Sequence, residues 1–130
     1  MTGEHRKVVL ICDDDQFTRM LVRAAVEAAG MDAEEAMNGA HALAMVAEVR
    51  PDVIVLDLMM PGMDGVSGCS RLREHPDAQD TPILVVSGTL DEDQVDRAYA
   101  AGATDFMAKP IDWPRFSAKL LSLTDKPSDD

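Results

Sequence analysis

The sequence has few aromatic residues, few cysteines and no long apolar run. Aromatic residues make up 4% of the 130 residues, and the two cysteines lack metal-binding spacing. No apolar stretch approaches the roughly 20 residues that cross a bilayer. The apolar run after the first seven residues is only five residues long, too short for a signal peptide. We therefore expect a cytoplasmic protein with buried, reduced thiols and no membrane association.

Basic residues are also scarce. The sequence has 12 lysines and arginines and 24 acidic residues, which gives a formal net charge of −12. Such a chain repels the phosphate backbone of nucleic acids and anionic lipid surfaces. The composition therefore argues against nucleic acid as a partner.

Short β-branched runs alternate with helical patterns along a chain long enough for about one domain. This alternation predicts an α/β fold, a doubly wound parallel sheet with helices on both faces. We expect one domain over residues 7–124, with flexible ends at 1–6 and 125–130. The predicted strands are 8–12, 32–36, 53–56, 83–86 and 104–108, and a helix follows each.

Apolar spacing also predicts which helix faces meet the core. In the first helix, we assign Arg19, Arg23 and Glu27 to a polar face. The residues expected to point inward are Phe17, Leu21, Ala24, Ala25 and Ala28 in the first helix and Leu43, Val46 and Ala47 in the second.

Acidic residues end two of the predicted strands. Asp13 and Asp14 follow the run 8–12, and Asp57 follows the run 53–56. If these strands are parallel neighbours, their carboxyl ends meet, and three crowded carboxylates repel each other unless a cation neutralises them. The pattern predicts a divalent metal site, with Mg²⁺ as the ion that suits carboxylates and Mn²⁺ as a substitute.

Two further polar residues end later strands. Ser87 follows the fourth strand and Lys109 the fifth, so both are expected at the same edge of the sheet. A hydroxyl and an ammonium beside a hard cation form a pocket that can hold or transfer a phosphoryl group. Asp15 is interpreted as a helix cap and is left out of the predicted site.

The stretch 57–65, together with Cys12-Asp13-Asp14-Asp15 and Lys109-Pro110, resembles a bacterial response-regulator receiver domain of the chemotaxis-regulator type. The resemblance extends over residues 7–123. It implies a flavodoxin-like (βα)5 fold with strand order 2-1-3-4-5. It also implies a cis Lys109–Pro110 peptide bond.

The resemblance further implies a function in two-component signalling. The domain is expected to accept a phosphoryl group from a phosphohistidine and to catalyse only its own phosphorylation and dephosphorylation. The implied roles are phosphoacceptor for Asp57, direct Mg²⁺ ligand for Asp14, water-mediated ligand for Asp13, main-chain carbonyl ligand for Met59, switch hydroxyl for Ser87, phosphoryl-pairing cation for Lys109 and switch aromatic for Phe106.

The implied partners are a sensor histidine kinase or phosphotransfer protein and a downstream effector or fused output domain. Phosphorylation would change the surface of the fourth helix, fifth strand and fifth helix. The sequence leaves open whether that surface also forms a dimer.

Two other functions fit the same pattern of residues. A Mg²⁺-dependent phosphohydrolase with an aspartyl-phosphate intermediate could use the same acids, but it needs a cap segment for which the chain has no spare residues. A flavin-binding module needs an anion-binding loop after the first strand, where Asp13, Asp14 and Asp15 would repel the phosphate.

In the family that the chain resembles, the side chains two residues beyond the phosphoacceptor and two beyond the switch hydroxyl tune the aspartyl-phosphate lifetime. These are Met59 and Thr89 here, and neither is suited to orient an attacking water. We therefore predict slow autodephosphorylation. The phosphoprotein should retain its label for minutes in an intact-mass time course, and loss within seconds would contradict the prediction.

Overall fold

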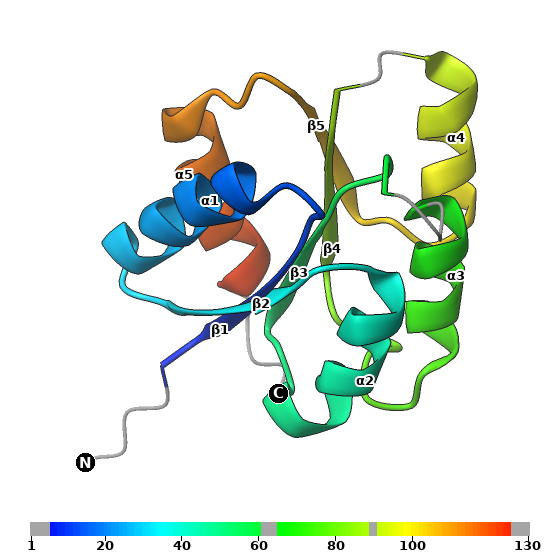
Figure 1. The fold of residues 1–130 in the computed structure, drawn as a ribbon, viewed down its shortest axis with the longest axis horizontal. Coiled ribbons are helices and arrows are strands. Elements are labelled where there is room, and N and C mark those ends of the chain that lie inside the picture. Colours follow the sequence, from blue (N-terminus) through cyan, green and yellow to red (C-terminus); the bar gives the residue numbers. More distant parts are fainter. Residues whose placement is uncertain (1–5, 61–64, 89–90, 126–130) are drawn as a thin grey trace.

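The structure is a computed structural model that describes residues 6–60, 65–88 and 91–125. Strands and helices alternate along these ranges, as the sequence predicts (Figure 1). Apart from Arg6 and Asp125, the residues predicted to be flexible ends lie outside the described ranges. The strands are β1 (Val8–Cys12), β2 (Asp32–Ala36), β3 (Val53–Leu56), β4 (Ile83–Ser87) and β5 (Asp105–Ala108); the helices are α1 (Gln16–Ala28), α2 (Gly39–Val49), α3 (Gly65–Glu74), α4 (Glu92–Ala100) and α5 (Trp113–Thr124).

The five strands form one parallel sheet in the order β2-β1-β3-β4-β5. This order confirms the predicted flavodoxin-like topology. In the register of the sheet, Cys12 pairs with Leu56, and Ser87 pairs with Ala108. The residues that directly follow β1, β3 and β5 therefore lie at one edge of the sheet, and the two outer strands are β2 and β5.

Two apolar cores pack against opposite faces of the sheet. Helices α1 and α5 cover one face, and α2, α3 and α4 cover the other (Figure 1). Side chains alternate between faces along a strand, so Val9 and Ile11 join the first core while Leu10 and Cys12 join the second. Burial on both faces explains why the central strands are continuous apolar runs. No helix in the described part of the chain is long and apolar enough to cross a membrane.

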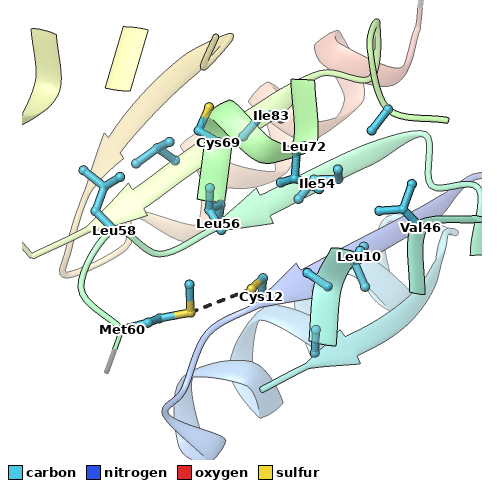
Figure 2. Close-up of a cluster of buried hydrophobic side chains, with 14 of the residues drawn as sticks. Leu10, Cys12, Val46, Ile54, Leu56, Leu58, Met60, Cys69, Leu72 and Ile83 are labelled. Carbon is cyan, nitrogen blue, oxygen red and sulfur yellow. Dashed lines mark hydrogen bonds between the residues drawn. The ribbon is translucent and has the colours of Figure 1, made fainter. Parts of the chain in front are cut away.

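Both cysteines are free and buried, as predicted. Figure 2 shows Cys12 beside Met60, where the thiol donates to the thioether sulfur at 3.7 Å. Burial, with the adjacent negative charges of Asp13 and Asp57, raises the pKa of the Cys12 thiol to about 12. Because the thiolate is the reactive form, Cys12 is a packing residue at neutral pH.

Glycines follow two of the helices in backbone conformations that favour glycine. Gly30 ends α1 with φ +86°, and Gly102 follows α4 with φ +115°, both in the left-handed region that favours glycine. The side chain of Asp15 accepts a hydrogen bond from the N–H of Thr18, so Asp15 caps α1 as predicted. The Lys109–Pro110 peptide bond is cis, as the resemblance implies.

The predicted inward faces of α1 and α2 are partly wrong. Phe17 is 61% exposed and Leu21 is 38% exposed, whereas Arg19 is buried together with Val22 and Val26. Alanines dominated the predicted face, and small side chains carry little information on which side of a helix is buried. Of the other residues predicted to point inward, Ala25, Leu43 and Val46 are at least partly buried, but Ala24, Ala28 and Ala47 are exposed.

The observed face of α1 predicts a large loss of stability at one residue of the helix and almost none at another. Val26→Ala should lower the free energy of unfolding by about 2 kcal/mol, because it leaves a cavity in a packed core. Met20→Ala, at a position 55% exposed, should change it by less than about 0.5 kcal/mol. Urea denaturation measures both values, and equal losses would show that α1 packs through a different face.

Candidate acidic site

Three carboxylates meet where β1 and β3 end. The N–H of Asp57 donates to the carbonyl of Cys12 at 3.0 Å, and the N–H of Asp13 donates to the carbonyl of Ala36 at 3.3 Å. These main-chain bonds extend the sheet pairing one residue beyond the strands and hold both aspartates at its edge. One oxygen each of Asp13, Asp14 and Asp57 lies within 4.8 Å of the others. Asp13 and Asp57 are buried, and Asp14 is exposed.

Lys109 reaches this cluster from the end of β5. Its main-chain N–H donates to the carbonyl of Ser87 at 2.9 Å, which fixes the backbone beside β4. Its ammonium donates to Asp13 Oδ2 at 3.1 Å and lies 3.5 Å from Asp57 Oδ2. One cation is therefore shared by two buried carboxylates from two other strands.

The charges in the cluster are not balanced by the lysine alone. Burial raises the pKa of Asp57, and repulsion by Asp13 adds to this. The hydrogen bond from the Met59 N–H, 3.1 Å from Asp57 Oδ1, and the Lys109 charge act in the opposite direction without cancelling it. For Lys109, burial lowers the pKa, but the bond to Asp13 and the attraction of Asp57 outweigh it and raise the pKa overall. The site therefore holds excess negative charge that favours a further cation.

The donor set fits a magnesium ion. All three side chains offer carboxylate oxygens, the ligands that hard divalent cations prefer. One oxygen from each of the three carboxylates lies within 4.8 Å of the others, so the three side chains converge on one place where they could share a single ion. The exposure of Asp14 leaves the cluster open to solvent, as a cation that keeps several waters requires.

The remaining predicted site residues lie around this cluster. Ser87 is buried at the end of β4, which lies between β3 and β5 in the sheet. Phe106 in β5 is half-buried and packs against the core formed with α2, α3 and α4. The Met59 side chain is exposed, while its N–H bonds to Asp57. Thr89 lies outside the described residues.

Large apolar side chains are exposed near the acidic cluster. Phe17 stands in the first turn of α1, Met37 directly follows β2, and Met59 follows Asp57 by two residues. All three therefore belong to segments at the carboxyl edge of the sheet, and each is more than half exposed.

Sequence reasoning missed one residue of this region. Arg19, assigned to a polar face, is buried and donates to the main-chain carbonyl of Asp13 at 2.7 Å. The available signal was its spacing from Val22 and Val26, which puts the three side chains on one face of a helix.

The comparisons with known proteins define the class. Residues 9–121 match the family model described as "Response regulator receiver domain". The chain therefore belongs to the response regulator receiver domain family.

Curated relatives agree with this assignment. Response regulator PleD of Caulobacter vibrioides is 36% identical over 116 residues, which cover 89% of this chain and 26% of that protein. Response regulator MprA of Mycobacterium avium is 37% identical over 124 residues, which cover 94% of this chain and 54% of that protein. The chain thus spans between about a quarter and about half the length of these relatives.

Solved structures show the same fold along nearly the whole chain. The chemotaxis protein CheY4 of Vibrio cholerae matches with a TM-score of 0.87 and 29% identity, covering 92% of this chain and 99% of that one. A putative response regulator from Chloroflexus aurantiacus matches with a TM-score of 0.88 and 28% identity, covering 94% and 100%.

Asp57→Asn should stabilise the metal-free protein, because it removes one of two buried carboxylates that repel each other. We expect a gain on the order of 1 kcal/mol at pH 7, measured by urea denaturation with a chelator. Because the pKa of Asp57 is raised in the folded state, acid protonates it there first and relieves the repulsion. The gain should therefore shrink as the pH falls into the carboxyl range. Asp96→Asn, at an exposed position of α4, is the control, and an equal gain there would contradict a local effect.

Proposed function

We propose that the chain is a phosphorylation-dependent signalling switch that accepts a phosphoryl group on Asp57 from a phosphohistidine, with Mg²⁺ bound at the acidic cluster. The single observation that carries this proposal is the placement of Asp57. It is a buried carboxylate with Lys109 on one side and two further acids within reach of a shared cation. We further propose that residues 7–124 are the functional receiver unit and that it acts in the cytoplasm.

The proposed step is a displacement at phosphorus. A carboxylate oxygen of Asp57 attacks, the new P–O bond forms, and the P–N bond to the histidine breaks, so that the imidazole leaves and takes up a proton. Mg²⁺, held by Asp13, Asp14, Asp57 and the Met59 carbonyl, would neutralise the charge that spreads over the phosphoryl oxygens. The burial of Asp57 limits competing water and strengthens the electrostatic interactions in the pocket.

Lys109 and Ser87 are proposed to act on the phosphoryl group after transfer. The Lys109 ammonium already lies 3.5 Å from Asp57 Oδ2, so it can pair with an oxygen of a group attached there. Ser87 ends the strand between β3 and β5, and its hydroxyl can donate to another oxygen. Their contacts with the phosphoryl group would stabilise one conformation of the domain more than the other, and phosphorylation would therefore shift the equilibrium between the two.

The donor is proposed to be a protein, either a sensor histidine kinase or a phosphotransfer protein. The exposed apolar side chains of Phe17, Met37 and Met59 beside the acidic cluster support a protein surface as the contact. A small phosphate ester would need a covered pocket instead, which favours the switch over a phosphohydrolase.

The output surface is proposed to be α4, β5 and α5, with a downstream effector or a fused output domain as its partner. Asp105 of β5 links these three elements: it pairs with Lys119 of α5 at 2.5 Å and accepts from the Tyr99 hydroxyl of α4 at 3.4 Å. Phe106, the expected switch aromatic, is the next residue in the strand, and an inward turn of its ring on phosphorylation would disturb these contacts. A second copy of the chain is the other occupant that this surface could take.

The proposal predicts one phosphoryl group per chain. Incubation with acetyl phosphate and Mg²⁺, followed by intact mass, should show a single addition that Mn²⁺ also supports and that a chelator prevents. Asp57→Asn should abolish it, because the attacking oxygen is lost.

Asp15→Asn is the matched control, since Asp15 caps α1 two residues after Asp13 and asparagine caps equally well. It should accept the phosphoryl group as the parent does. Phosphorylation that persists in Asp57→Asn, or multiple turnover of p-nitrophenyl phosphate, would overturn the proposal.

A further inference from the structure

Arg19 is one of the few charged side chains buried in the described part of the chain. It lies in the first turns of α1 and retains 9% of its exposed surface. Arginine is rarely buried unless it is paired. Its guanidinium has two partners: Asp13, which directly follows β1, and Glu35, which lies in β2.

The contact with Asp13 is made to the main chain. Nη1 of Arg19 donates to the carbonyl oxygen of Asp13 at 2.7 Å. That oxygen belongs to the peptide unit that joins Asp13 to Asp14, and a peptide unit is rigid and planar. A donor that holds this oxygen therefore holds the plane from which both carboxylates extend.

Other bonds hold the two ends of the same segment. The N–H of Asp13 donates to the carbonyl of Ala36, and Oδ1 of Asp13 accepts from the N–H of Asp15 at 2.8 Å. Without Arg19, the carbonyl of Asp13 would lose its charged donor while these bonds remained. The peptide plane could then rotate, and the direction of the Asp14 carboxylate would change with it.

Glu35 fixes the guanidinium itself. Its Oε1 accepts from Nε of Arg19 at 3.0 Å, while its Oε2 lies 3.4 Å from Nη1 of Arg23. Because a guanidinium is planar, its separate N–H groups can serve two partners in fixed directions at once. Arg19 thus connects β2 to the loop that carries the acids.

We propose that Arg19 is a positioning residue that orients the Asp13–Asp14 peptide so that both carboxylates face one divalent cation. This inference rests on the proposed function. The charge of Arg19 would act in the opposite direction, because a nearby cation repels a second one. If Arg19 acts by orienting the peptide, a neutral side chain in its place should raise the Kd for Mg²⁺. If its charge dominates, the same replacement should lower that Kd.

Isothermal titration calorimetry of the unphosphorylated chain with MgCl₂ alone measures this Kd and shows in which direction it changes. Arg19→Met should raise the Kd for Mg²⁺ on the order of tenfold, the loss typical when a group that orients a metal ligand is removed. Arg19→Lys keeps the charge but cannot serve both partners in the same geometry, so its Kd should also rise. A lower Kd in Arg19→Met, or an unchanged Kd in Arg19→Lys, would overturn the proposal.

Arg23→Met is the matched control. Arg23 lies one turn further along α1, pairs with the same glutamate and has the same charge, but its hydrogen bond goes to the Ala33 carbonyl. Its Kd should stay within about twofold of the parent. A rise equal to that of Arg19→Met would show that any loss around Glu35 weakens the site, which contradicts a specific role for the Asp13 carbonyl.

The result also separates this inference from the proposed function. If the parent chain binds Mg²⁺ and accepts a phosphoryl group while Arg19→Met binds equally well, the inference alone fails. If the parent does neither, the proposed function fails. Cooperative urea unfolding confirms that each variant is folded, and Arg19→Lys carries the test if Arg19→Met does not fold.

Discussion

The mutual repulsion of acids at one sheet edge is the constraint on which the site depends. Asp13 and Asp57 are held side by side by main-chain bonds that belong to the sheet, so they cannot separate without breaking strand pairing. The fold tolerates this because Lys109 lies between them and because Asp14 faces solvent. A cluster of carboxylates that repel each other would destabilise a purely structural edge, but it is suited to binding a cation that supplies the missing positive charge.

The sheet brings together acidic residues that lie far apart in the sequence. Parallel strands joined by right-handed crossovers bring all carboxyl ends to the same edge, whatever the length of the intervening helices. In this chain, Asp14 and Asp57 are 43 positions apart, yet one oxygen of each lies within 4.8 Å of the other. The two cores on either side fix this edge, because every central strand is buried on both faces.

Much of the fold and of the site could be predicted from the sequence because strands and strand ends have strong local signals. The runs before Asp13 and Asp57 are β-branched and short, and the topology follows from their alternation with helices. The face of α1 could not be predicted in the same way, since alanine fits either side of a helix. The role of Arg19 was hidden for a related reason, because an arginine looks polar until a buried carbonyl and a glutamate on another strand are placed beside it.

The acidic residues of the outer strand β2 affect how this edge of the sheet can meet another molecule. Its sequence carries Asp32, Glu34 and Glu35 along a strand that has a neighbour on one side only. Open strand edges are templates for aggregation, and charged side chains make that pairing unfavourable. Two copies that approached through β2 would have to bring these charged side chains into the new contact, so the strand disfavours edge-to-edge association.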